Sequence, residues 1–126
     1  MAKPLNTFRA DLRTLPSVKL PAATIHPFSG EHCMLVYVEA RAGTELPAHS
    51  HRQEQLTFVE SGRIWVEIEG QEPFEIGPHE LAYFPANVLH QTRVLEDTIS
   101  YDVFSPPNDD LARRAKEAQG DLGYGA

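Results

Sequence analysis

Apolar and polar residues alternate along most of the chain with a period of two, which is the pattern of half-buried β-strands. In residues 63–69, Ile64, Val66 and Ile68 alternate with residues that are mostly charged. Ten prolines and eight glycines interrupt the chain, so no segment before residue 107 suits a helix with a 3.6-residue period. The pattern predicts strands at residues 34–40, 55–60, 63–69, 73–76, 81–84, 90–94 and 98–104. Short strands at such close spacing predict an all-β sandwich, jelly roll or barrel.

The two ends of the chain differ from this strand-rich middle. Residues 1–30 hold four of the ten prolines and are expected to form an arm, in which residues 23–26 add an edge strand. Residues 108–118 have acidic side chains first, basic ones later, and a capping Asn or Asp at the start, so they predict one short helix. The residues from Gly120 onward are expected to form a loose tail.

Length and composition narrow the class of protein. A chain of 126 residues predicts one domain, and 41% hydrophobic and 23% charged residues are ordinary globular values that permit a core without disulfides. The single cysteine, Cys33, is expected to be a buried packing residue, and the reducing cytoplasm is the expected compartment. A net charge of -7 without a dense basic cluster argues against nucleic-acid binding, and no apolar window is long enough for a membrane span.

Three histidines and one glutamine are the candidate metal ligands. His49 and His51 precede a predicted strand, so in an extended chain both imidazoles face one side; Gln55 has the same parity, and His90 opens a later strand. Three imidazoles and an amide oxygen suit a divalent metal such as Zn, Ni, Fe, Mn or Co. Taken alone, the pair is equally compatible with two surface histidines, and His90 with a partly buried core residue. The histidines expected outside the site are His26, His32 and His79.

The candidate ligands lie in two segments that resemble the two motifs of cupins. Residues 43–62 keep every spacing of the first motif, G-x5-H-x-H-x3-E-x6-G, with Gln55 in place of the usual glutamate. Gly77 and residues 85–90 (PANVLH) are similar to the second motif, with Asn87 in place of a glycine and a Gly-to-Pro spacing two residues longer. The resemblance implies a cupin double-stranded β-helix, or jelly-roll barrel, with a short C-terminal helix. It also implies that one divalent metal is bound by His49, His51, Gln55 and His90.

The residue pattern and the resemblance together predict an organisation within one domain: an N-terminal arm (1–30), a cupin barrel core (31–107) and a short helix and tail (108–126). Gln55 makes the expected ligand set neutral, so the full divalent charge would stay on the ion and the site should be the stronger Lewis acid. Glu54 has the opposite parity and is expected to point outward.

A narrower resemblance connects the chain with small single-domain cupins of pectin and alginate breakdown, which convert 4,5-unsaturated monouronates into linear keto forms. It rests on HSHRQEQ, PANVLH and residues 95–107, and it covers about residues 30–110. It implies that the metal binds substrate oxygens, that Asp102 assists proton transfer and that Phe104 shapes the substrate pocket. From its position alone, Asp102 could equally be a cross-strand partner.

One position departs from that pattern. These cupins typically have an arginine, suited to a uronate carboxylate, where this chain has Asn108. Asn108 is therefore a candidate substrate contact, or else a helix cap. A substrate carboxylate would need one of the other candidate cations, which are Arg41, Arg63, Arg93, Arg113 and Arg114.

Three function classes fit these residues. The favoured one is an isomerase-like or lyase-like enzyme for metal-assisted tautomerisation or isomerisation of a small sugar acid or keto/enol acid. The alternatives are a cupin-type metal-dependent dioxygenase and a non-catalytic cupin that binds a small molecule. The resemblance also implies a homodimer. The expected partners are a small-molecule substrate and a second copy of the chain, with no nucleic acid and no membrane.

Overall fold

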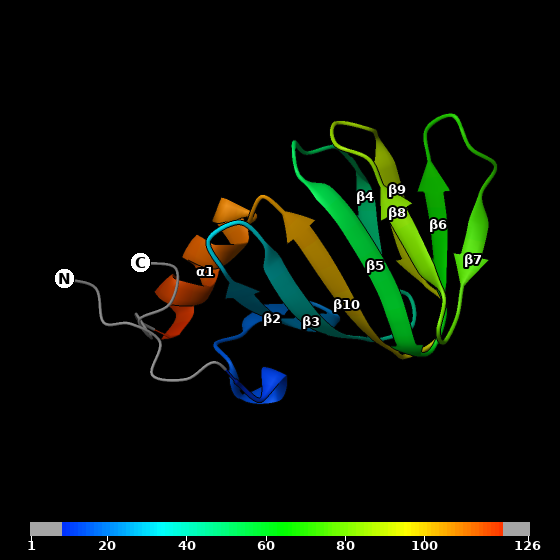
Figure 1. Ribbon diagram of the computed structural model, residues 1–126. Coiled ribbons are helices and arrows are strands. Elements are labelled where there is room, and N and C mark those ends of the chain that lie inside the picture. Colours follow the sequence, from blue (N-terminus) through cyan, green and yellow to red (C-terminus); the bar gives the residue numbers. More distant parts are fainter. Residues whose placement is uncertain (1–8, 120–126) are drawn as a thin grey trace.

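The computed structural model describes residues 9–119, and strands dominate it (Figure 1). A six-stranded sheet has the order β1-β2-β3-β10-β5-β8, a four-stranded sheet has the order β4-β9-β6-β7, and neighbouring strands are antiparallel. This is the jelly-roll architecture that the sequence predicts. The elements are η1 (Leu12–Thr14), β1 (Val18–Leu20), β2 (Ala23–Ser29), β3 (Met34–Ala40), β4 (Glu45–His49), β5 (Glu54–Ser61), β6 (Ile64–Ile68), β7 (Phe74–Ile76), β8 (Leu81–Phe84), β9 (His90–Val94), β10 (Thr98–Ser105) and α1 (Asp109–Gln119).

All the strands predicted from the two-residue period are present, with ends that agree to within one residue. The pattern missed β1 and β4. Most of β4 is exposed and carries Pro47, so its residues show no alternation of buried and exposed positions. This strand is nevertheless important, because it ends on His49 at the candidate site.

The arm contributes two strands, and the prediction that residues 23–26 form an edge strand is wrong. β2 lies inside the sheet between β1 and β3, and β1 is the edge. β1 is only three residues long and pairs with residues 23–25, so Pro27, which has no N–H, lies beyond the ladder between these strands. The ring of His26 on β2 is buried, with its Nδ1 2.9 Å from the carbonyl oxygen of Leu15. That contact attaches the arm to the sheet.

Two hydrophobic clusters form most of the core. One lies between the sheets around Phe84 and Val66, both with 0% exposure. The other includes Met34 and Phe104, and Leu111 and Ala112 of α1 pack against it. The inner face of the larger sheet is therefore covered partly by the smaller sheet and partly by the helix.

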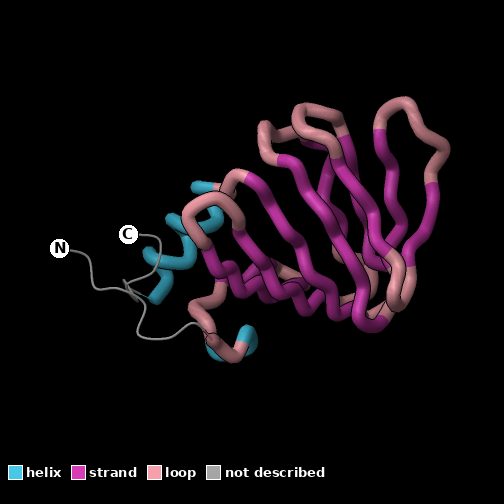
Figure 2. Tube along the Cα trace, in the orientation of Figure 1, coloured by secondary structure: helices cyan, strands magenta, loops and turns pink. Residues whose placement is uncertain are grey.

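The predicted C-terminal helix is confirmed as α1, which starts one residue later than expected. The Asn108 side-chain oxygen accepts a hydrogen bond from the Leu111 N–H at 3.1 Å, as an N-cap does. The two helices are the only helical segments among residues 9–119, and both lie on the side of the molecule where β2 is (Figure 2). Neither is long and apolar enough to cross a membrane. The tail from Gly120 and the first eight residues of the arm lie outside the described residues.

The expectation that Cys33 is buried is wrong, because Cys33 is exposed. It occupies the turn between β2 and β3, where the Gly30 N–H donates to the Cys33 carbonyl oxygen at 2.7 Å. Met34, the next residue, begins β3 and is 1% exposed. The turn therefore ends one residue before the chain enters the core.

The surroundings of Gly62, the last glycine of the first motif, explain why glycine is needed there. A Cβ on Gly62 would lie 2.2 Å from Thr98 Oγ1 and 2.5 Å from the Asp97 carbonyl oxygen, at a φ of +96°. Gly43 has a similar φ of +93° but no atom within 4 Å of such a Cβ.

We expect Gly43→Ala to cost about 1–2 kcal/mol of unfolding free energy, which is the left-handed backbone penalty. Gly62→Ala should cost more, because the backbone at residues 97–98 must also move.

Urea unfolding of the two variants against the wild type measures this difference. Equal losses at both positions would show that the contact with residues 97–98 is accommodated without cost.

Candidate metal centre

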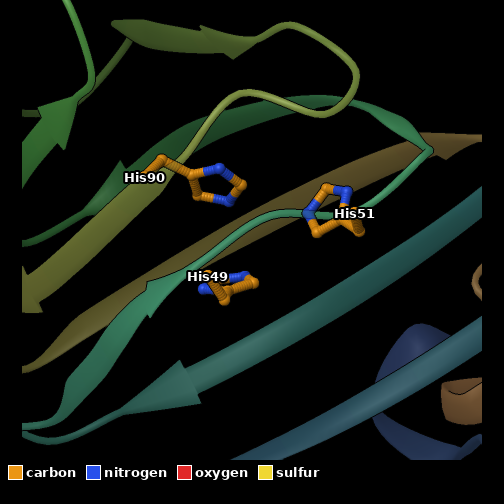
Figure 3. A group of neighbouring side chains, drawn as sticks. All are labelled: His49, His51 and His90. Carbon is orange, nitrogen blue, oxygen red and sulfur yellow. The ribbon is translucent and has the colours of Figure 1, made fainter.

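Three histidines from three different segments converge inside the barrel (Figure 3). His49 ends β4, His51 lies in the β4–β5 loop and His90 begins β9. One nitrogen from each ring lies within 4.8 Å of the other two. His49 and His90 are directly opposed in the ladder between β4 and β9, with ring centroids 4.4 Å apart. Pairing within the smaller sheet thus brings two of the rings together.

Each imidazole is oriented by the backbone close to it. In all three rings Nδ1 lies within hydrogen-bond distance of a carbonyl oxygen two residues away. Donation from Nδ1 to a carbonyl leaves Nε2 as the acceptor of the neutral ring, which is the usual arrangement around a histidine-bound metal. The carbonyls and distances are Pro47 at 2.8 Å for His49, Gln53 at 3.0 Å for His51 and Val88 at 3.0 Å for His90.

The Nε2 atom of His90 is buried and has no hydrogen-bond partner among the described residues. Burial also lowers the pKa of His90, an effect opposed by the bond to Val88 and reinforced by His49 and His51. The ring is therefore held in its neutral form, which is the form that binds a metal. A buried nitrogen without a partner is costly unless something binds it. These three residues fit a divalent transition metal.

Gln55 adds an oxygen to the same cluster. Its Oε1 lies 3.1 Å from His51 Nε2, and its Nε2 donates to Thr57 Oγ1 at 2.9 Å. Because His51 Nδ1 faces the Gln53 carbonyl, Nε2 of the neutral ring is an acceptor, and so is the amide oxygen of Gln55. Two acceptors at this distance repel each other unless a metal ion or a proton lies between them. The orientation of Gln55 is therefore what a metal ligand requires.

Asp102 lies next to this cluster on β10, directly opposite Thr57 on β5. The Thr57 hydroxyl donates to Asp102 Oδ1 at 2.6 Å, and Gln55 Nε2 donates to the same oxygen at 3.5 Å. Burial raises the pKa of Asp102 to about 6, although both hydrogen bonds act to lower it. Asp102 thus has a cross-strand partner, and its part in proton transfer stays a prediction.

The two residues predicted to contact substrate, Phe104 and Asn108, have different surroundings. Phe104 is 5% exposed, and the edge of its ring meets the ring of His51 at a centroid distance of 5.6 Å. It therefore forms part of the wall beside His51. Asn108 uses its side-chain oxygen to cap α1. The substrate contacts of both residues stay predictions.

The candidate arginines are divided between the two ends of the barrel. In the ladder between β6 and β9, Ile68 pairs with His90, whereas Arg93 pairs with Trp65 and Arg63 precedes the opposite end of β6. Arg41 follows the end of β3 that pairs with Thr98. These three arginines lie away from the histidines. Of the candidates named for a substrate carboxylate, Arg113 and Arg114 of α1 remain. Sequence reasoning overlooked Arg52, which follows His51 directly and lies 3.6 Å from Asp109.

The expected outward orientation of Glu54 is confirmed. Glu54 is exposed and accepts a hydrogen bond from the Tyr83 hydroxyl. The histidines outside the metal cluster are His26, His32 and His79.

Sequence reasoning missed two residues that contact the site. Thr57 has the same strand parity as Gln55 and could have been found by that rule. Gln53, whose carbonyl orients His51, gives no such signal, since every residue carries a carbonyl group.

The fold and the three-histidine site define a metal-binding type of jelly-roll protein, and sequence comparison gives its family. Residues 36–102 match the cupin domain family, and the chain belongs to that family. No curated protein matches the chain in sequence.

Several solved structures share the architecture. KdgF from Halomonas sp. is 28% identical, with a TM-score of 0.70 over 75% of this chain and 90% of that one. An RmlC-like cupin from Shewanella frigidimarina NCIMB 400 is 20% identical, with a TM-score of 0.76 over 83% of this chain and 96% of that one. Ectoine synthase from P. lautus is 17% identical, with a TM-score of 0.71 over 81% and 80% of the two chains. The last two likenesses concern the fold alone.

The metal centre generates a direct test. His51→Ala removes one of three converging nitrogens, and we expect it to abolish most divalent-metal binding. His79→Ala, which changes an exposed turn histidine outside the cluster, is the matched control. Metal content after loading with Zn, Ni, Fe, Mn or Co, measured by mass spectrometry, compares the two. Full occupancy in both His51→Ala and His90→Ala would exclude this site as the place of binding.

Proposed function

We propose that this cupin binds one divalent transition metal through His49, His51, His90 and the amide oxygen of Gln55. We further propose that it is an enzyme that tautomerises or isomerises a small sugar acid or keto/enol acid. The observation that carries the proposal is the convergence of three imidazoles and an amide oxygen beside the carboxyl group of Asp102. The likeness to KdgF at 28% identity supports a function of the same kind as that protein's.

The metal and the protein would divide the chemistry. A bound divalent cation supplies Lewis acidity, which polarises a carbonyl or enol oxygen of the substrate. Asp102 accepts a proton from one position of the substrate and returns it at another, which is the role of a general base and acid. Thr57 and Gln55 both donate to Oδ1 of Asp102, so we assign the proton transfer to Oδ2. Phe104 helps to exclude water from the side of His51.

The substrate class follows from the sequence resemblance to cupins that act on unsaturated uronates and stays a proposal. An acid bound here lacks the usual arginine, since position 108 is an asparagine whose side-chain oxygen caps α1. Of the Asn108 side chain, only the amide N–H groups are then free to donate to a carboxylate, and a neutral donor binds it more weakly than a guanidinium. A weaker affinity for uronates, or a different small acid as substrate, is expected.

The homodimer and the division into arm, core and helix stay predictions, as does the cytoplasmic location.

The outer face of the larger sheet has a surface suited to a second copy. Leu56 pairs with Tyr83 and Phe58 pairs with Leu81 across β5 and β8, and all four side chains are 38–57% exposed. Contiguous exposed apolar side chains of this kind often mark contacts between proteins.

The neutral charge of Gln55 gives a second test of the proposal. Gln55→Glu keeps an oxygen ligand, so metal content should stay at the wild-type level. It adds a negative charge to the site and removes the N–H that donates to Thr57 and Asp102. Turnover should fall, because the added charge lowers the electrophilicity of the ion. Turnover at or above the wild-type value, at equal metal content, would show that a neutral ligand is not required for polarisation.

Asp102→Asn tests proton transfer on 4,5-unsaturated monouronates. We expect kcat to fall by about 10²-fold or more, since a carboxamide cannot exchange the proton. Asp97→Asn is the control, because Asp97 accepts a hydrogen bond from the Ala42 N–H near the opposite end of β10. Formation of the keto product is followed by absorbance and NMR for the metal-loaded proteins.

Undiminished turnover in Asp102→Asn would restrict Asp102 to a cross-strand role. No turnover of any such acid by the wild type, together with oxygen consumption by the iron-loaded protein on an aromatic or diketone substrate, would replace the isomerase by a dioxygenase.

A further inference from the structure

We propose that Gln53 is a positioning residue for His51, which it holds by linking the β4–β5 loop to the segment that leads into α1. The inference rests on the proposed metal centre and assigns a role to a residue that lies outside its ligand set. Gln53 is 7% exposed although it is polar and lies in a loop. Polar side chains buried to this degree need a hydrogen-bond partner.

The backbone and the side chain of Gln53 have separate partners. Its carbonyl oxygen lies 3.0 Å from His51 Nδ1 and fixes the direction of the imidazole. Its side-chain Nε2 donates to the Pro107 carbonyl oxygen at 3.3 Å. Pro107 follows β10, the strand that carries Asp102 and Phe104. One residue therefore connects a metal-ligand candidate with the chain that follows the proposed proton-transfer residue.

His51 needs such support more than the other two histidines. His49 and His90 belong to paired strands, and their directions follow from the ladder between β4 and β9. His51 lies outside any strand, and its own backbone is held from one side, where the Asn87 N–H donates to the His51 carbonyl oxygen at 2.7 Å. Asn87 belongs to the turn before His90. The Gln53 amide supplies the attachment on the other side, to the end of β10.

The neighbouring ion pair cannot replace this attachment. Arg52 and Asp109 also connect the loop with α1, but their atoms are 3.6 Å apart and their side chains are 63% and 86% exposed. Exposed pairs of this kind contribute little to the position of a loop. The buried amide of Gln53 is the contact that defines the geometry.

The test uses Gln53→Met, which keeps the length of the side chain and removes the donor to Pro107. Gln91→Met is the matched control, because Gln91 also follows a candidate ligand closely, is half-buried and donates through Nε2, but to Glu67 on the smaller sheet. We expect the dissociation constant for Zn, measured by competition with a chelator, to rise about 10- to 100-fold in Gln53→Met and to stay unchanged in Gln91→Met. In metal-free protein, NMR should show the His51 Nδ1–H signal of the wild type lost or exchanging faster in Gln53→Met only.

These two readouts separate the inference from the proposed function. If the wild type binds no divalent metal, the metal centre fails, while the His51 Nδ1–H signal still decides the role of Gln53. Unchanged zinc affinity and an unchanged His51 signal in a folded Gln53→Met protein would overturn the inference, as would equal losses in Gln91→Met. Should Gln53→Met not fold, Gln53→Glu removes the same donor at nearly the same shape and is judged by the same two measurements.

Discussion

The ladder between β4 and β9 places His49 opposite His90, and the site depends on that register. A shift of one residue in either strand would turn one imidazole to the outer surface of the sheet, because successive side chains alternate between its faces. The Val88 and Pro47 carbonyls, which orient the two rings, each lie two residues before the histidine along the chain. Pairing within the smaller sheet therefore places the two rings, and the carbonyl two residues before each histidine determines which ring nitrogen is available.

The larger sheet supplies the other half of the site through a short chain of polar side chains. Gln55 donates to Thr57, and Thr57 donates to Asp102, across the pairing of β5 with β10. An amide is well suited to the first position, because it offers its oxygen toward His51 and an N–H toward Thr57 at once. A carboxylate there would provide the oxygen but not the donor. The departure from the usual glutamate thus agrees with the polar contacts around it.

Periodicity predicted the strands that are half-buried and missed those that are not. β4 carries no alternation because most of it faces solvent, and β1 is a three-residue edge between two prolines. The convergence of His49, His51 and Gln55 was foreseen from strand parity, although His51 lies in a loop. The motif spacing, rather than an extended backbone, explains that success. Contacts made by backbone carbonyl groups, such as that of Gln53, could not be predicted from the sequence, because every residue type carries the same carbonyl group.

The two sheets differ in width by two strands, and α1 fills the difference by packing Leu111 and Ala112 against the cluster around Met34. A chain cut after Ser105 would open that cluster to water and remove the Pro107 carbonyl that receives Gln53. The last helix is thus a lid on the interior rather than a surface appendage. Deletions that reach α1 therefore act on the core, whereas a side chain added at Gly70, in the exposed β6–β7 loop, meets no atom within 4 Å of its Cβ.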